Sequence, residues 1–107
     1  MERYWEVKFS NTKLLKLYET GSSGKYRLDK TVIKNFFQVV AILEAAKDIH
    51  DLWRQPSLHF ERLQGRDNYY SVRLTLKWRL EMSIAWSDEK MTVGIISIEE
   101  ISSHYGG

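Results

Sequence analysis

The hydrophobic side chains of this chain change their spacing once, near residue 58, and that change constrains the fold more than any other feature. Between residues 29 and 47 they recur at helical spacing, as on one buried face of an α-helix that should start near Asp29, a capping side chain. From residue 58 onward they alternate, as on one face of a β-strand. The alternation is clearest in residues 78–86, where one face carries Trp78, Leu80, Met82, Ile84 and Trp86. Helices should therefore come first and a run of strands later.

Cap and turn signals divide the rest of the chain into shorter elements. Residues 4–9 mix aromatic and β-branched side chains with charges, which predicts a strand. Asn11 is a good cap for a helix over residues 13–18, and Gly21 would end that helix. The expected remaining strands are 58–61, 70–74 and 91–99, with turns at 64–68 and 87–90. This order predicts an α+β fold in which two N-terminal helices pack on one face of an antiparallel-rich sheet.

The composition fits one ordinary globular domain over residues 1–107. The chain is 43% hydrophobic and 28% charged, and it carries four Trp, six Tyr and four Phe, which can bury a large apolar area. It has no cysteine, so a disulfide framework and a thiolate zinc site are both excluded. No apolar run approaches the length of a membrane span, so we expect a soluble, cytoplasmic protein that has no membrane partner.

The net charge of +2 is spread unevenly along the chain. Residues 3–34 carry eight Lys or Arg against three Asp or Glu, and residues 52–87 carry six against three. A basic surface attracts nucleic acid because it displaces counterions from phosphates. A solvated surface with no ligand is the other explanation, and charge alone leaves both open.

The polar face of the predicted sheet is the place to look for chemistry, since the helices should cover the other face. If residues 70–74 and 78–86 pair as a hairpin with matched apolar faces, Arg73 lies opposite or diagonal to Arg79. Like charges across a ladder destabilise it, and a phosphate between them would relieve the repulsion. Alternatively the arginines splay apart or pair with Glu61 and Glu81.

The sequence offers no metal or cofactor motif, so we expect neither group. His50, His59 and His104 are far apart, and no spacing matches a zinc site. No glycine-rich phosphate loop or nucleophile elbow is present. A histidine without a metal can still transfer protons near neutral pH, although His104 by itself is better explained as a residue of a disordered tail.

Three segments together resemble the HigB type of the RelE/ParE toxin superfamily. They are the Leu-x-Gly turn at residues 63–65, the aromatic-Ser-Val strand at residues 70–72 and the aromatic-Arg-Leu strand at residues 78–80. Residues 98–105, with His104, resemble the histidine-bearing end of the same family, and residues 14–21 resemble its first helix. The resemblance covers nearly the whole chain in the correct order.

This resemblance implies a RelE-like toxin that is neutralised by a HigA-like helix-turn-helix antitoxin and that cleaves mRNA on the ribosome. The implied reaction needs no metal, because the RNA 2′-hydroxyl is itself the nucleophile. His104 would be the general acid or base, Arg79 would hold the phosphate, and Arg73 would support it. Tyr70 and Tyr105 would stack on RNA bases, and the cations of Lys77 and Arg66 would also bind RNA.

The chain departs from the family pattern at several positions. Glu61 and Gln64 stand where many members have His or Lys, Thr75-Leu76 replaces a tight hairpin turn, and Ser102-Ser103 replaces Asp-Tyr. Glu61 is therefore either a substitute base or the partner of an arginine in a salt bridge. Two other functions stay open: a non-enzymatic ParE-like gyrase poison and an inactive domain that only binds an antitoxin.

Overall fold

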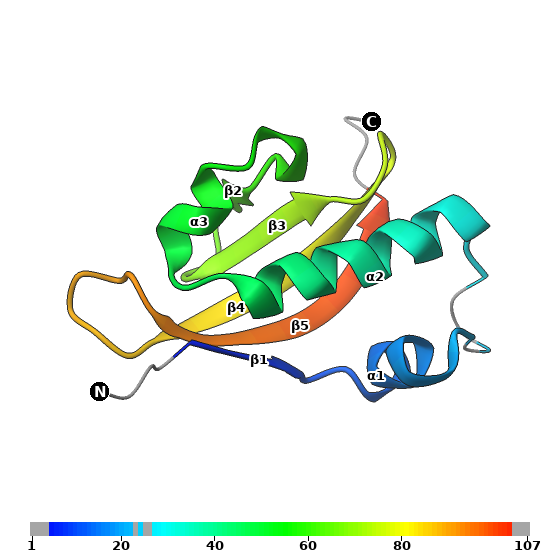
Figure 1. Cartoon of the computed structure of the whole chain (residues 1–107), viewed down its shortest axis with the longest axis horizontal. Coiled ribbons are helices and arrows are strands. Elements are labelled where there is room, and N and C mark those ends of the chain that lie inside the picture. Colours follow the sequence, from blue (N-terminus) through cyan, green and yellow to red (C-terminus); the bar gives the residue numbers. More distant parts are fainter. Residues whose placement is uncertain (1–4, 23, 25–26, 104–107) are drawn as a thin grey trace.

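A computed structural model describes residues 5–22, 24 and 27–103 (Figure 1). The elements in order are β1 (Glu6–Phe9), α1 (Thr12–Thr20), α2 (Lys30–Ala45), α3 (Ile49–Trp53), the 3-10 turn η1 (Pro56–Leu58), β2 (Glu61–Arg62), β3 (Tyr69–Arg73), β4 (Trp78–Trp86) and β5 (Gly94–Ser103). The predicted order of helices first and strands later is confirmed.

The five strands form one mixed sheet in the order β1-β5-β4-β3-β2. β1 runs parallel to β5, whereas β2, β3, β4 and β5 pair antiparallel. The long helix α2 crosses one face of this sheet (Figure 1). The α+β architecture with an antiparallel-rich sheet is therefore confirmed, and the parallel β1 is the detail that the sequence pattern did not indicate.

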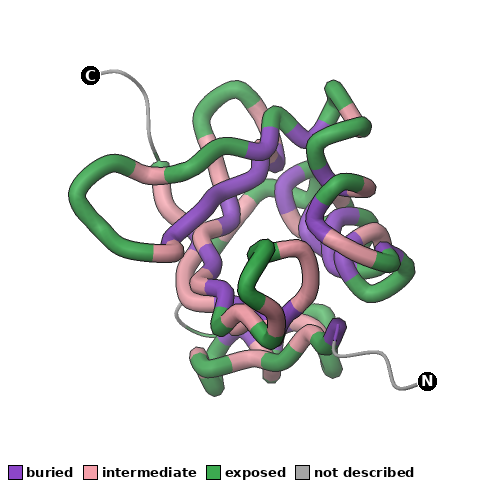
Figure 2. The backbone as a smooth tube through the Cα atoms, turned by 90° about the vertical axis from the view of Figure 1, so that its left-hand side faces the viewer, coloured by how far each residue is buried: buried purple, intermediate pink, exposed green. Residues whose placement is uncertain are grey.

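The core lies between the helices and the apolar face of the sheet, and Figure 2 marks its buried residues along both. Leu14 and Leu17 of α1 and Phe36 of α2 are fully buried there. From the sheet side, alternate residues of β4 enter the same core, among them Leu80 and Met82. The alternation read from residues 78–86 thus identifies the face that the helices cover, and it leaves the polar face open.

The sequence predicted the cap of α1 correctly and the cap of α2 incorrectly. The side chain of Asn11 accepts hydrogen bonds from the backbone N–H of Lys13 and Leu14, and Gly21 ends α1 in the left-handed conformation with φ 82°. Both signals are confirmed, although α1 is longer than residues 13–18. Asp29 makes no side-chain cap hydrogen bond at the start of α2, so the predicted cap there is wrong. Burial of its apolar face stabilises α2 instead.

Two predicted strands have different limits in the structure. Residues 58–61 do not form a strand, because Leu58 ends η1 and His59 takes the left-handed conformation with φ 45°, so only Glu61–Arg62 pair. The last strand occupies Gly94–Ser103 rather than 91–99, because Asp88 holds the preceding residues in a turn. β5 then runs on beside β4 as far as the pair Trp78 and Ser103.

The short helix α3 was not predicted, and it places His50 on a helix rather than in a loop. Its five residues are too few to show a helical period. The side chain of Asp48 caps it, accepting from the N–H of His50 and Asp51. None of the helices in the described parts of the chain has the length and apolar character that crossing a membrane requires.

Candidate active site

Arg79 of β4 is a cation on the polar face of the sheet whose side chain is fixed by hydrogen bonds. Its Nε donates to the hydroxyl of Ser71 at 2.8 Å, and its Nη2 donates to the backbone carbonyl of His59 at 2.6 Å. Only 12% of the side chain is exposed, although Arg79 lies on the polar face of the sheet. Burial is the main cause that lowers the pKa of Arg79, and the nearby charge of Arg73 lowers it further, while Glu61 opposes the shift.

Glu61 of β2 lies at the rim of this site. Its Oε2 is 3.8 Å from Nη2 of Arg79, and 55% of its side chain is exposed. The salt bridge considered for Glu61 is therefore present. The distance exceeds that of a direct hydrogen bond, so the carboxylate neutralises part of the charge on Arg79 and leaves the guanidinium held mainly by Ser71 and His59.

Arg73 of β3 lies directly opposite Arg79 in the β3–β4 ladder. The predicted register is confirmed. Side chains paired in this way start about 5 Å apart, so two positive charges share one place on the polar face. Such a pair is suited to a phosphate, because each planar guanidinium can donate two parallel hydrogen bonds to phosphate oxygens.

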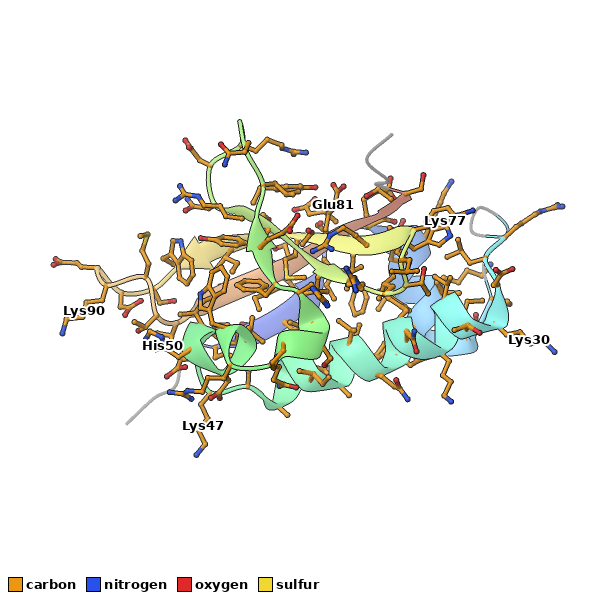
Figure 3. All side chains as sticks on the ribbon, turned by 90° about the horizontal axis from the view of Figure 1, so that it is seen from above. Lys30, Lys47, His50, Lys77, Glu81 and Lys90 are labelled. Atoms are coloured by element: carbon orange, nitrogen blue, oxygen red, sulfur yellow. The ribbon has the colours of Figure 1, made fainter. Side chains whose placement is uncertain are left out.

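The other predicted RNA-binding residues are not gathered around Arg79. Tyr70 is only 7% exposed, and its ring stacks on Phe60 with 5.2 Å between centroids and 6° between planes. Since alternate residues of β3 face opposite sides, Tyr70 belongs to the core, and the prediction that it stacks on RNA is wrong. Lys77 is exposed in the β3–β4 loop (Figure 3), and this loop lines a cavity together with Thr31 and Val32 of α2.

Arg66 lies in the β2–β3 loop, with its Cζ 3.6 Å above the centre of the Tyr69 ring. The predicted residues His104 and Tyr105 lie outside the described residues. The described chain does approach the site from β5, because Ser102 is the ladder partner of Arg79. The site therefore consists of Arg79, Arg73 and Glu61, with Arg66 over Tyr69 at the opposite end of β3 from Arg73.

The half of the polar face towards β5 is acidic. Glu81 accepts from the hydroxyl of Ser102 at 2.5 Å, and Glu99 accepts from the hydroxyl of Ser83 at 2.7 Å. Among the described residues, no three His, Asp or Glu side chains are placed to hold a metal ion. The polar face thus has a basic half, with Arg73 and Arg79 beside the β3–β4 loop, and an acidic half, with Glu81 and Glu99 further along β4 and β5.

A family model described as "RelE-like toxin of type II toxin-antitoxin system HigB" matches residues 7–93. The chain belongs to the HigB-like toxin family. It is therefore a toxin of a type II toxin–antitoxin system, and a toxin of this kind has an antitoxin partner. A solved structure, a YoeB/ParE toxin from Agrobacterium tumefaciens, has the same fold, with a TM-score of 0.53 and 16% identity over 94% of this chain and 99% of that one. No curated protein matches in sequence.

Sequence reasoning missed two residues that shape the site of this HigB-like toxin. Ser71 is fully buried, yet it faces the polar side and supplies an oxygen to Arg79. The carbonyl of His59 becomes an acceptor because the left-handed turn at that residue directs it towards β4. The serine of the Tyr-Ser-Val segment was a visible signal for the first contact. Nothing local in the sequence signals the second.

Proposed function

We propose that this HigB-like toxin is an endoribonuclease that cuts mRNA on the ribosome and thereby inhibits translation. The observation that carries the proposal is the pair of arginines, Arg73 and Arg79, facing each other across β3 and β4 on the open side of the sheet. Two partly buried arginines at facing positions of the ladder form a site for one phosphate. The neighbouring acidic half would repel the rest of a long RNA, so the substrate must be presented in a bent or extruded form.

The reaction needs only the groups of the RNA and of the protein. The 2′-hydroxyl loses its proton to a base and attacks the adjacent phosphorus, and the bond to the 5′-oxygen breaks. That oxygen takes a proton, leaving a 2′,3′-cyclic phosphate on one fragment and a 5′-hydroxyl on the other. Arg79, whose orientation is already set by Ser71 and His59, would stabilise the charge that develops on the phosphate oxygens.

Two residues are proposed to move protons in this reaction. His104 is the general acid or base suggested by the family resemblance, and Ser102 brings the chain to the ladder position opposite Arg79 two residues earlier. Glu61 is the other candidate, because its carboxylate lies 3.8 Å from Nη2 of Arg79. Its side chain is 55% exposed, so RNA bound to the arginines could reach it. The cognate antitoxin, which we expect to be a HigA-like helix-turn-helix protein, would act by blocking this face.

The test is to express the toxin and map mRNA ends on translating ribosomes by toeprinting. We expect growth arrest that the antitoxin from the adjacent gene relieves, new mRNA ends in the decoding site, and little cleavage of free mRNA. Cleavage should persist when phenanthroline removes transition metals and magnesium is kept for the ribosome. Arg79→Ala should abolish cleavage, and His104→Ala should slow it at least about tenfold, since proton transfer is typically worth about 10²–10⁴-fold.

Arg54→Ala is the matched control, because that arginine is 71% exposed on α3 and pairs only locally with Asp51. It should cut like the wild type. If no variant and no wild-type protein cuts RNA while gyrase becomes trapped on DNA, the ParE-like alternative is correct. If folded protein binds its antitoxin but is harmless, the chain is an inactive binding domain.

A further inference from the structure

Tyr69 and Arg66 form a second feature on the polar face, next to the arginine pair. Tyr69 begins β3 and shares its face with Ser71 and Arg73. Its side chain is only 5% exposed although none of the described helices covers this side of the sheet. Part of the cover is the guanidinium of Arg66, whose Cζ lies over the ring at 3.6 Å from its centroid.

The cover over Tyr69 belongs to an exposed loop rather than to the core. Arg66 is itself exposed, and the loop turns through Gly65 with φ 81° and Asn68 with φ 55°. A cavity of about 360 Å³ is lined by residues 62–67 of this loop, including Arg66. Rotation of one side chain would therefore uncover the ring, without moving the strand.

The hydroxyl end of the Tyr69 ring contacts the acidic half of the polar face. Its hydroxyl is hydrogen-bonded to Glu81, and burial together with the charge of Glu81 raises the pKa of Tyr69 to about 12. The ring is therefore neutral and fixed in direction at physiological pH. Proteins bind an unpaired base by stacking it on an aromatic ring or a guanidinium group, and Tyr69 and Arg66 supply one of each.

We propose that Tyr69 and Arg66 bind one unpaired nucleobase of the RNA, adjoining the phosphate held by Arg73 and Arg79. The base enters between the ring and the guanidinium, stacking on Tyr69 with Arg66 on its outer side. Tyr69 and Arg73 are four residues apart on β3, a distance of about 13 Å. One nucleotide together with the length of an arginine side chain can span it. This subsite rests on the proposed ribonuclease function.

Photochemical cross-linking tests the subsite on the intact toxin bound to programmed ribosomes. The probe is an mRNA with iodouridine at the nucleotides flanking the cleavage site and a deoxynucleotide in place of the attacking hydroxyl. Irradiation should join the RNA to the peptide that contains Tyr69, and Tyr69→Phe should keep the cross-link because it keeps the ring. A cross-link that maps to other aromatic residues, or none at all to this peptide, overturns the subsite.

A kinetic measurement accompanies the cross-link. Tyr69→Leu should lower kcat/KM for ribosome-bound mRNA about tenfold, in line with the loss of one stacked base. Trp53→Leu is the matched control, because Trp53 is a 51% exposed aromatic residue on α3 and should leave cleavage unchanged. If unmodified mRNA is cut normally by Tyr69→Leu, only the subsite fails. If the wild type cuts no mRNA at all, the ribonuclease function fails instead.

Discussion

At the scale of single residues, the active-site arginine is also part of the folded structure. The guanidinium of Arg79 satisfies the hydroxyl of the fully buried Ser71 and the carbonyl of His59, whose left-handed backbone depends on local support. A cation fixed in this way loses little freedom when substrate binds. The cost is that the residue cannot be removed without disturbing the protein around it.

We expect Arg79→Ala to abolish RNA cleavage and also to lower the free energy of unfolding by about 1.5–3 kcal/mol, because hydrogen bonds to a charged group are lost and their acceptors stay partly buried. Arg79→Lys should recover some stability and little activity, since lysine lacks the planar fork. Urea unfolding followed by tryptophan fluorescence, together with toeprinting, measures both effects. An alanine variant as stable as the wild type would show that these contacts contribute nothing.

At the scale of elements, the turn between β4 and β5 sets where the last strand begins. Asp88 accepts from the backbone N–H of Thr92 at 2.9 Å and of Val93 at 3.1 Å, and also from the hydroxyl of Thr92. Met91 takes a left-handed conformation within the turn. These contacts hold the residues before β5 in a turn, which the N–H of Ser87 closes by donating to the carbonyl of Val93 at 2.8 Å, and β5 starts at Gly94.

The turn should make stability depend on acid pH. The hydrogen bond from Thr92 is the largest cause that lowers the pKa of Asp88 below its ordinary value of 3.8. A carboxylate with a lowered pKa stabilises the fold above pH 3.8, and this contribution is lost as the pH falls through the lower folded value. The difference in unfolding free energy between wild type and Asp88→Asn should therefore shrink below pH 3.8 in urea titrations. Parallel curves down to acid pH would contradict this.

The first residue of β5 requires glycine for a reason of space. A Cβ on Gly94 would lie 2.4 Å from the carbonyl oxygen of Ala85 and 2.9 Å from the Cα of Trp86, both on the paired strand. We expect Gly94→Ala to destabilise the protein by about 1–3 kcal/mol, as overpacking usually does. Gly24→Ala is the control, because nothing lies within 4 Å of its added Cβ. Equal melting temperatures for the two variants would refute the prediction.

At the scale of the whole molecule, the described beginning and end of the chain are joined at the edge of the sheet. β1 pairs in parallel with β5, and next to this pairing the side chain of Asn11 donates to the carbonyl of Glu99 at 2.9 Å. Trp5 adds a buried hydrogen bond from its ring nitrogen to the carbonyl of Leu43. The single core can close only after these distant segments meet.

Asn11 therefore has two roles that substitution can separate. Asn11→Ser keeps an oxygen that caps α1 but loses the donor to Glu99, so we expect a loss of about 1 kcal/mol. Asn11→Ala loses the cap as well, which adds about 1 kcal/mol. Thermal unfolding of the two variants gives the two contributions. If serine and alanine are equally destabilising, the cap at α1 contributes nothing to global stability.

Much of the fold follows from local rules that the sequence displays. The helical spacing in residues 29–47, the alternation in residues 78–86 and the Asn11 cap all depend on neighbours within a few positions, and each predicted the correct element. The pairing of Arg73 with Arg79 was also predictable, because matching the apolar faces of two adjacent strands leaves one register.

Other features depend on residues far apart in the chain, and only the tertiary structure decides them. Burial of Arg79 requires the backbone of His59, twenty positions earlier, to turn towards β4. The parallel pairing of β1 with β5 and the late start of β5 depend on contacts that no periodicity encodes. Periodicity tells which face of an element is apolar, whereas the surroundings of a polar side chain are set by whichever distant segments the closed core brings beside it.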